Sequence, residues 1–253
     1  MTEKTTAMTE MAWTEFAAQK DNSIIALCVG SVEQHGPHLP LSVDLLIPYH
    51  LTLQLGETEP VITAPPLHYA YRSSPATGGG QSFPGTTALS GETLILLVRD
   101  ILNDFVRQGI RKFLIMNGHF ENTAFIGEAA QLVTAVRPDV KVVIVNWWDI
   151  VKAKTLETLF PTGFPGWEVE HASLTETSLI MHYRPDLVRT EMIPDQKGEK
   201  HQPGPLVYPE PKGLVPASGI LFTANGASAA IGAALAEEIV KSVKEIIKAE
   251  FGN

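Results

Sequence analysis

The sequence lacks the features that mark several classes of protein. It has a single cysteine, Cys28, so no disulfide can form within the chain, and its apolar neighbours predict a small buried side chain. No apolar run is long enough to span a bilayer. The first residues, MTEKTTAMTEMAWTEF, lack the apolar core of a signal peptide. Together these absences predict a cytoplasmic protein.

Basic residues are also scarce. The chain has 19 lysines and arginines against 28 aspartates and glutamates, a net charge of -9, and no basic cluster. Nucleic acids and anionic membranes attract basic surfaces, so neither is expected as a partner. A small-molecule ligand fits this composition better.

Short apolar runs alternate with amphipathic segments along the chain. Strands are expected where β-branched residues dominate, at 23–30, 61–65, 112–118 and 141–147. Helices are expected at 90–109, 121–136, 173–183 and 228–251, with Ser90 as an N-cap and Gly109 at the following C-terminus. The alternation predicts an α/β fold with a mostly parallel sheet covered on both faces. With 253 residues, we expect one domain over 1–253, and a long surface excursion over the proline-rich and glycine-rich residues 185–222, with a role in oligomer contacts.

Coordinating side chains follow the expected strands. Glu33 and His35 come after the first strand, and His119 and Glu121 after the third, each pair two residues apart. In extended backbone, such pairs point to the same side. The carboxyl ends of parallel strands meet at one edge, where ligands collect, so the two pairs are expected to face each other.

Asp44 opens the next segment and completes a set of two imidazoles and three carboxylates. These ligands suit zinc, manganese and related divalent ions. Five are too many for one tetrahedral zinc, but they suit two ions about 3.5–4 Å apart that share a carboxylate and activate water. Taken singly, Glu-x-His is typical of a surface accident and Asn-Gly-His of a turn. For His38 we favour a hydrogen bond that supports a ligand or a loop over metal binding.

The stretches GSVEQHGPHLPLSVD (30–44) and NGHFEN (117–122) resemble the two signatures of the creatininase family. GGGQSFPGTTALSG (78–91), NWWDIVK (146–152) and FPGWEVEHASLTETSL (164–179) resemble further creatininase segments in the same order. The resemblance runs from about Trp13 to Ser178 and thins after Pro185. The segments that contain tryptophan are closest to creatininase proper.

The resemblance implies a three-layer α/β/α sandwich, a homohexamer, and a binuclear centre of zinc and often manganese. By it, Glu33 and His119 would bind one ion, His35 and Glu121 the other, and Asp44 would bridge both. This is the same set that the spacing selects.

The resemblance also implies a substrate site. Trp148 and Trp167 match tryptophans that enclose the substrate ring, His171 matches a histidine that transfers protons during ring opening, and Glu176 matches an acid near the centre. Taken on the sequence alone, the tryptophans of NWWD are typical of core aromatics beside a helix.

Three positions depart from the creatininase pattern. Phe120 stands in place of a tyrosine that contacts substrate, Glu168 in place of an aspartate, and Thr77 in place of a serine. A site built to hydrogen-bond one substrate rejects analogues sharply, so these changes bear on specificity. The glycine run at 78–80 does not match a phosphate-binding loop and indicates close passage past a ligand or a strand.

The resulting prediction is a metal-dependent hydrolase that opens a small cyclic amide, with creatinine as the leading substrate. Glu121, Trp148, Trp167 and His171 are the catalytic candidates. Thr77, Phe120, Trp167, Glu168 and His171 are the substrate-binding candidates, and Glu168 is expected to pair with a guanidine nitrogen. Two alternatives stay open: a related hydrolase for another amide or formamide, and a metal-bound assembly or sensor protein without catalysis. The sequence does not decide the native metal.

Overall fold

The computed structural model describes residues 5–198, 204–205, 207–209 and 213–252. Its centre is a parallel sheet of four strands in the order β2-β1-β3-β4. The strands are β1 (Ile24–Val29), β2 (Val61–Thr63), β3 (Lys112–Asn117) and β4 (Lys141–Asn146). Each lies within a predicted apolar run, and the parallel pairing confirms the α/β fold expected from the sequence.

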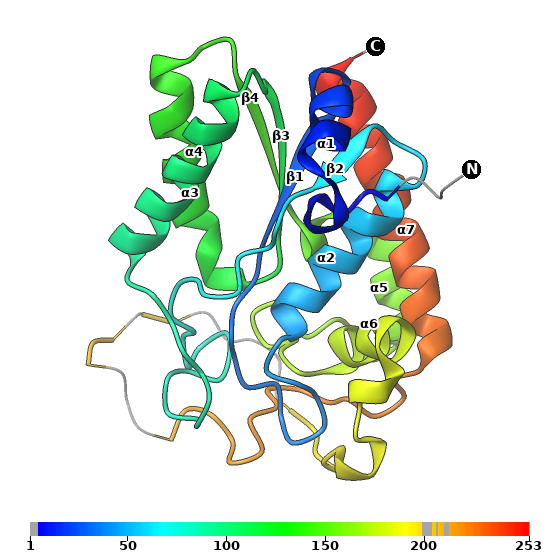
Figure 1. Cartoon of the computed structure of the whole chain (residues 1–253). Coiled ribbons are helices and arrows are strands. Elements are labelled where there is room, and N and C mark those ends of the chain that lie inside the picture. Colours follow the sequence, from blue (N-terminus) through cyan, green and yellow to red (C-terminus); the bar gives the residue numbers. More distant parts are fainter. Residues whose placement is uncertain (1–4, 199–203, 206, 210–212, 253) are drawn as a thin grey trace.

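Helices cover both faces of the sheet, as Figure 1 shows. One face packs against α1 (Trp13–Gln19), α3 (Gly91–Arg107) and α4 (Thr123–Val136), and the other against α2 (Val43–Gly56), α6 (Leu174–Tyr183) and α7 (Ala229–Phe251). A short helix, α5 (Ala153–Leu159), lies beside α7. Side chains of β1 alternate between the two layers: Ala26 and Cys28 face α2, and Ile25 and Leu27 face α3. The result is a three-layer α/β/α arrangement. Within the described part of the chain, no helix combines the length and the apolar character that a membrane crossing requires.

The predicted helices form close to their expected limits. Ser90 caps α3 by accepting a hydrogen bond from the Thr93 backbone N–H, and Gly109 follows the helix with a φ of 98°. The residues at 120–122 form a 3-10 turn before α4 instead of its first turn. Helix α2 was not predicted, because it is apolar all round and contains Pro48.

The carboxyl ends of the strands point toward the loops at the bottom of Figure 1, and both termini lie near the opposite end. Two glycines bring α2 against this edge. A Cβ on Gly30 would lie 2.7 Å from the Leu45 Cα, and a Cβ on Gly118 would lie 1.8 Å from the Asp44 carbonyl oxygen. No other residue fits at these positions without movement of the backbone, so the glycines fix α2 beside the ends of β1 and β3.

The segment 185–222, part of which lies outside the described residues, is not wholly a surface excursion. Ile220 is fully buried, and the Leu221 backbone N–H donates to the His171 carbonyl at 3.3 Å. The described part contains only two short 3-10 turns, at 185–187 and 190–192. Its last residues therefore support the loop that holds His171.

Candidate metal centre and cavity

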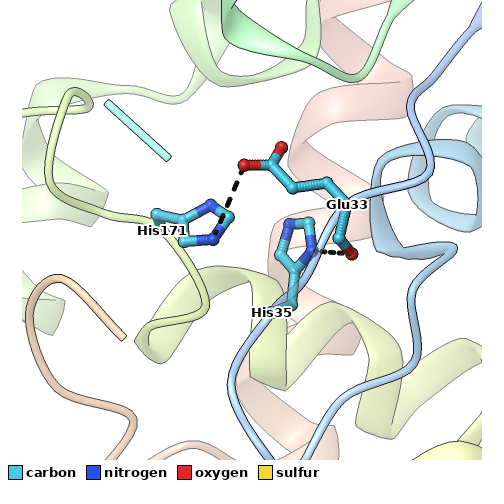
Figure 2. Close-up of side chains that lie close together, drawn as sticks. All are labelled: Glu33, His35 and His171. Atoms are coloured by element: carbon cyan, nitrogen blue, oxygen red, sulfur yellow. Dashed lines mark hydrogen bonds and ion pairs between the residues drawn. The ribbon is translucent and has the colours of Figure 1, made fainter. Parts of the chain in front are cut away.

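The loop that follows β1 places Glu33 and His35 inside the molecule, each 1% exposed. The His35 Nδ1–H donates to the Glu33 carbonyl oxygen at 3.1 Å, as Figure 2 shows. This bond fixes the ring and leaves Nε2 free to coordinate, the arrangement typical of a metal-binding histidine. His38 points elsewhere: its Nε2 is 2.9 Å from Thr177 Oγ1 on α6. Burial, helped by the nearby His35, lowers the His38 pKa to about 4.

Asp44, in the first turn of α2, lies between two histidines. Its Oδ1 is 3.0 Å from His35 Nε2, and its Oδ2 is 3.1 Å from His119 Nδ1. Glu33 Oε2 is 2.9 Å from the same His119 nitrogen. Three chain segments therefore converge on one buried carboxylate, which is the geometry of a bridging ligand.

Two further carboxylates flank this group. Glu121 Oε2 is 3.2 Å from His119 Nε2, and its Oε1 accepts from the Ser74 N–H at 2.7 Å and from the Thr77 hydroxyl. Glu176 Oε1 is 3.7 Å from His35 Nε2. The structure thus brings together all five predicted ligands. It adds Glu176 on the side of His35.

The cluster has the chemistry of a cation site. Three of its buried atoms, His35 Nε2, Asp44 Oδ2 and His119 Nε2, make no hydrogen bond. Three groups have ligand atoms close enough to share an ion: Glu33/Asp44/His119, His35/Asp44/Glu176 and Glu33/His35/His171. Imidazole nitrogens and carboxylate oxygens match zinc and manganese, so the residues fit the two ions that the sequence predicts.

The electrostatics of the cluster favour positive charge. Burial alone would lower the pKa of both histidines, but Asp44 and Glu176 raise that of His35 well above its ordinary value, and Glu121 and Glu33 do the same for His119. Burial also opposes ionisation of Glu33, but the neighbouring His171 and His119 hold its pKa well below the usual range. A potential that holds protons on two buried imidazoles also attracts a metal cation.

His171 lies beside the cluster, in the loop before α6. Its ring centroid is 4.3 Å from that of His35, and its Nε2 is 3.9 Å from Glu33 Oε1, the contact drawn in Figure 2. The same nitrogen is 2.9 Å from the Gln34 carbonyl oxygen. The next residue, Ala172, has a φ of 54°, a left-handed conformation that indicates local strain beside a site.

The glycine run passes directly over the ligands. The Gly79 N–H donates to Glu33 Oε1 at 2.9 Å, and Ser73 donates its hydroxyl to the same oxygen. A Cβ on Gly78 would lie 2.3 Å from Glu33 Oε1, and one on Gly79 would lie 2.0 Å from Gln34 Nε2. The glycines therefore permit close passage past a ligand, as the sequence indicates.

Aromatic rings form one wall of a cavity over the cluster. Phe120 and Trp148 stack with centroids 5.7 Å apart and an angle of 21°, and Trp147 meets Trp167 edge to face. Phe120 is 37% exposed and lies at the rim. The lining comprises Glu33, Asp44, Thr77, Gly118, His119, Phe120, Glu121, Trp147, Trp148, Trp167, Glu170, His171 and Glu176. The tryptophans of NWWD serve both roles considered above, because they are buried in the core and line the cavity.

One predicted substrate residue, Glu168, lies outside the cavity lining, whereas a neighbour that the sequence did not single out lies within it. Glu168 is half-buried and does not line the cavity, whereas Glu170 lines it and is only 3% exposed. Burial, with the nearby Glu176 carboxylate, raises the Glu170 pKa to about 8. In the sequence, Glu170 is marked only by its place beside His171, and other polar residues of the segment also lie near that histidine.

Comparisons with known proteins agree on one protein family. The creatininase family, described as creatinine amidohydrolase, matches residues 9–247. Creatinine amidohydrolase of Pseudomonas putida is 37% identical over 250 residues, which cover 96% of each chain. The mycofactocin precursor peptide peptidase of Mycobacterium tuberculosis is 30% identical over 87% of this chain and 84% of that protein.

Solved structures agree with the sequence comparison. A crystal structure of creatininase superposes with a TM-score of 0.95 at 36% identity, over 99% of each chain. A mutant creatininase complexed with creatine gives 0.94 at 36% identity, over 99% of this chain and all of that one. Other creatininases of this group have been solved in Zn-Zn and Mn forms. The chain belongs to the creatininase family.

Proposed function

We propose that this protein is a metal-dependent amidohydrolase that opens the ring of creatinine to give creatine. The observation that carries the proposal is the cavity itself, in which aromatic walls face a buried cluster of histidines and carboxylates. The similarity to the Pseudomonas creatinine amidohydrolase over nearly the whole chain supports the same substrate.

The metal ions would be held by Glu33, Asp44 and His119 on one side and by His35 on the other, with Glu121 as the remaining predicted ligand. When bound, such ions supply Lewis acidity and lower the pKa of water into the neutral range. The ligands are fixed in advance: the Glu33 carbonyl orients His35, and the 73–79 loop holds both Glu33 and Glu121.

The chain's own residues would bind and orient the substrate. Trp148 and Trp167 would flank a flat ring, a contact that is favourable for a guanidine-like group. Thr77 and Phe120 line the same cavity, but Phe120 offers no hydroxyl. The aromatic wall would also exclude water from the reacting carbonyl.

His171 would move the proton. Its Nε2 lies beside the cluster and next to the Gln34 carbonyl oxygen, so a proton on this atom has an acceptor nearby. An imidazole can act as a general acid, and in this position it would protonate the ring nitrogen that departs.

The test is creatine formation from creatinine by purified protein that has been stripped of metal and reloaded with zinc or manganese. Glu121→Gln serves as the blank. We expect turnover that depends on added metal and is lost in the variant. Absence of turnover in protein that holds two ions per chain would reject creatinine and direct the search to other cyclic ureides, lactams and formamides.

The alternatives are not favoured by the site. A metal-bound assembly or sensor protein has no need of His171 beside the cluster or of an aromatic cavity above it. A nucleotide-type substrate would need a phosphate-binding lysine or arginine, and among the described residues no basic side chain other than histidine lines the cavity. An acidic cavity fits a neutral or cationic substrate.

We also propose one hydrolase domain over 1–253, a homohexamer and a cytoplasmic location, with no nucleic acid or membrane partner. The family match over residues 9–247 supports one domain. The hexamer follows from the family resemblance, and the net charge of -9 speaks against polyanionic partners. Sedimentation analysis of the metal-loaded protein tests the oligomer directly.

A further inference from the structure

We propose that Glu170 is the carboxylate that binds the guanidine end of the substrate and stabilises the positive charge that develops there as the ring opens. This inference rests on the proposed function, and it assigns to Glu170 the role that the sequence had given to Glu168.

The first support is position. Glu170 lines the cavity together with Trp167 and His171, while Glu168 does not. Glu170 belongs to none of the groups of described residues that could share an ion, so it remains available to substrate.

The second support is that this buried carboxyl group lacks a positively charged partner among the described residues. Glu170 Oε1 accepts from the Thr175 N–H at 2.9 Å, and Oε2 accepts from the Thr175 hydroxyl. The Leu174 backbone N–H also contributes a hydrogen bond, and a carboxylate, which can accept about four, keeps room for one more donor. Among the described residues, no lysine, arginine or histidine forms an ion pair with this carboxylate, and its acidic neighbour Glu176 repels it. A buried carboxylate costs free energy unless it is paired, and a ligand in the cavity is the partner this position allows.

A purely structural role does not require a charge here. The two contacts with Thr175 hold the start of α6, but a glutamine makes both: its oxygen accepts from the N–H, and its amide donates to the hydroxyl. Glu170→Gln therefore removes the charge while it preserves the support of α6.

The chemistry of ring opening provides the charge. Water adds across the bond between the carbonyl carbon and the ring nitrogen: its OH forms the new C–O bond, the C–N bond breaks, and its remaining proton goes to that nitrogen. The carboxylic acid so formed passes its proton to the guanidine, which is no longer acylated and is strongly basic, like an arginine side chain. A neutral ring thus becomes a carboxylate and a guanidinium with no change in oxidation state. Glu170 would pair with the guanidinium as it forms.

The experiment compares metal-loaded wild type, Glu170→Gln and the competing variant Glu168→Gln on two rings. Creatinine yields a guanidinium, whereas 1-methylhydantoin has oxygen in place of the exocyclic nitrogen and yields a neutral urea. We expect Glu170→Gln to lower kcat on creatinine by about 10- to 100-fold, the effect of losing one hydrogen bond to a charged group. On 1-methylhydantoin the change should stay within about twofold, and Glu168→Gln should lower kcat on creatinine less than Glu170→Gln does.

A binding measurement separates this inference from the proposed function. Calorimetry of the zinc-loaded proteins with methylguanidinium and with methylurea needs no turnover. We expect Glu170→Gln to weaken methylguanidinium by about 10-fold or more and to leave methylurea unchanged. If wild type does not turn over creatinine, the proposed function fails, but the binding result still decides the role of Glu170. The binding result likewise decides that role if 1-methylhydantoin turns out not to be a substrate.

Two results would overturn the inference. Equal losses with creatinine and 1-methylhydantoin, or with methylguanidinium and methylurea, would show that Glu170 acts only through the packing of α6. A loss in Glu168→Gln as large as that in Glu170→Gln would return the guanidine contact to Glu168.

Discussion

Charged side chains differ in burial between the two edges of the sheet, the carboxyl edge where the strands end and the amino edge where they begin. At the carboxyl edge, His35, Asp44 and His119 are at most 3% exposed, and each holds an atom without a hydrogen-bond partner. At the amino edge, Lys141 pairs with Glu250 at 2.6 Å, but both side chains are about half exposed to solvent. Buried charges interact strongly and are costly to leave unmatched, whereas exposed pairs contribute little. The contrast indicates that the carboxyl edge is arranged around ligands, and four predictions test it.

The largest effect is expected from Asp44→Asn. This change removes the charge between His35 and His119 while it keeps the size of the side chain. Loss of an outer partner of a metal ligand already costs about 10- to 100-fold, so loss of this central carboxylate should lower metal affinity and kcat/KM by more than about 100-fold.

Metal analysis by mass spectrometry and steady-state kinetics check this prediction. The matched control is Asp149→Asn, because Asp149 follows β4 at the same edge but is exposed and accepts only from Asn146. Two ions per chain and full activity in Asp44→Asn would remove the contrast between the edges.

Gly79→Ala should have the next largest effect. The added methyl would lie 2.0 Å from Gln34 Nε2, so either the loop or Gln34 must move, and the loop also holds Glu33. Overpacking of this kind destabilises by about 1–3 kcal/mol. The displacement of Glu33 should lower kcat/KM as well.

Gly127→Ala is the matched control for thermal unfolding and kinetics. Gly127 lies in α4 with no atom within 4 Å of an added Cβ, so alanine should stabilise by roughly 0.5–1 kcal/mol through helix propensity. Equal behaviour of the two variants would show that the loop at 78–80 is not tightly packed on the ligands.

These examples also show which features could be read from the sequence. The strands and the helices α3, α4, α6 and α7 were predicted because apolar residues recur at the spacing of each element, and the ligand pairs because they follow two of these strands. Helix α2 has no polar face to define a period. The burial of Glu170, the exclusion of Glu168 and the support of His171 by Leu221 depend on contacts between distant segments. No local pattern distinguishes Glu170 from Glu168, so the sequence could not show which of the two carboxyl groups lines the cavity.

A pH-dependent effect is expected from Glu170 in protein stripped of metal. Its folded pKa is about 8 against an ordinary value of 4.5, so the folded state binds the proton more tightly. This stabilisation is complete below pH 4.5 and is lost as pH rises toward 8, at about 1.4 kcal/mol per unit at most. Glu170→Gln lacks this dependence. The unfolding free energy of the variant minus that of wild type should therefore increase from pH 6 to 8 and then level off. Denaturant unfolding at several pH values measures it, and parallel curves for the two proteins would contradict a raised pKa.

The smallest effect is expected at the amino edge, from Lys141→Met. The pair with Glu250 is exposed, so its loss should change the unfolding free energy by only about 0.2–1 kcal/mol, with less change at high salt. Metal content and kcat/KM should be unchanged, because Lys141 lies at the start of β4, at the opposite end of the strand from the cavity. A loss of metal in this variant would mean that the two edges are coupled through the sheet, and the charge at the carboxyl edge would then no longer act independently of the rest of the fold.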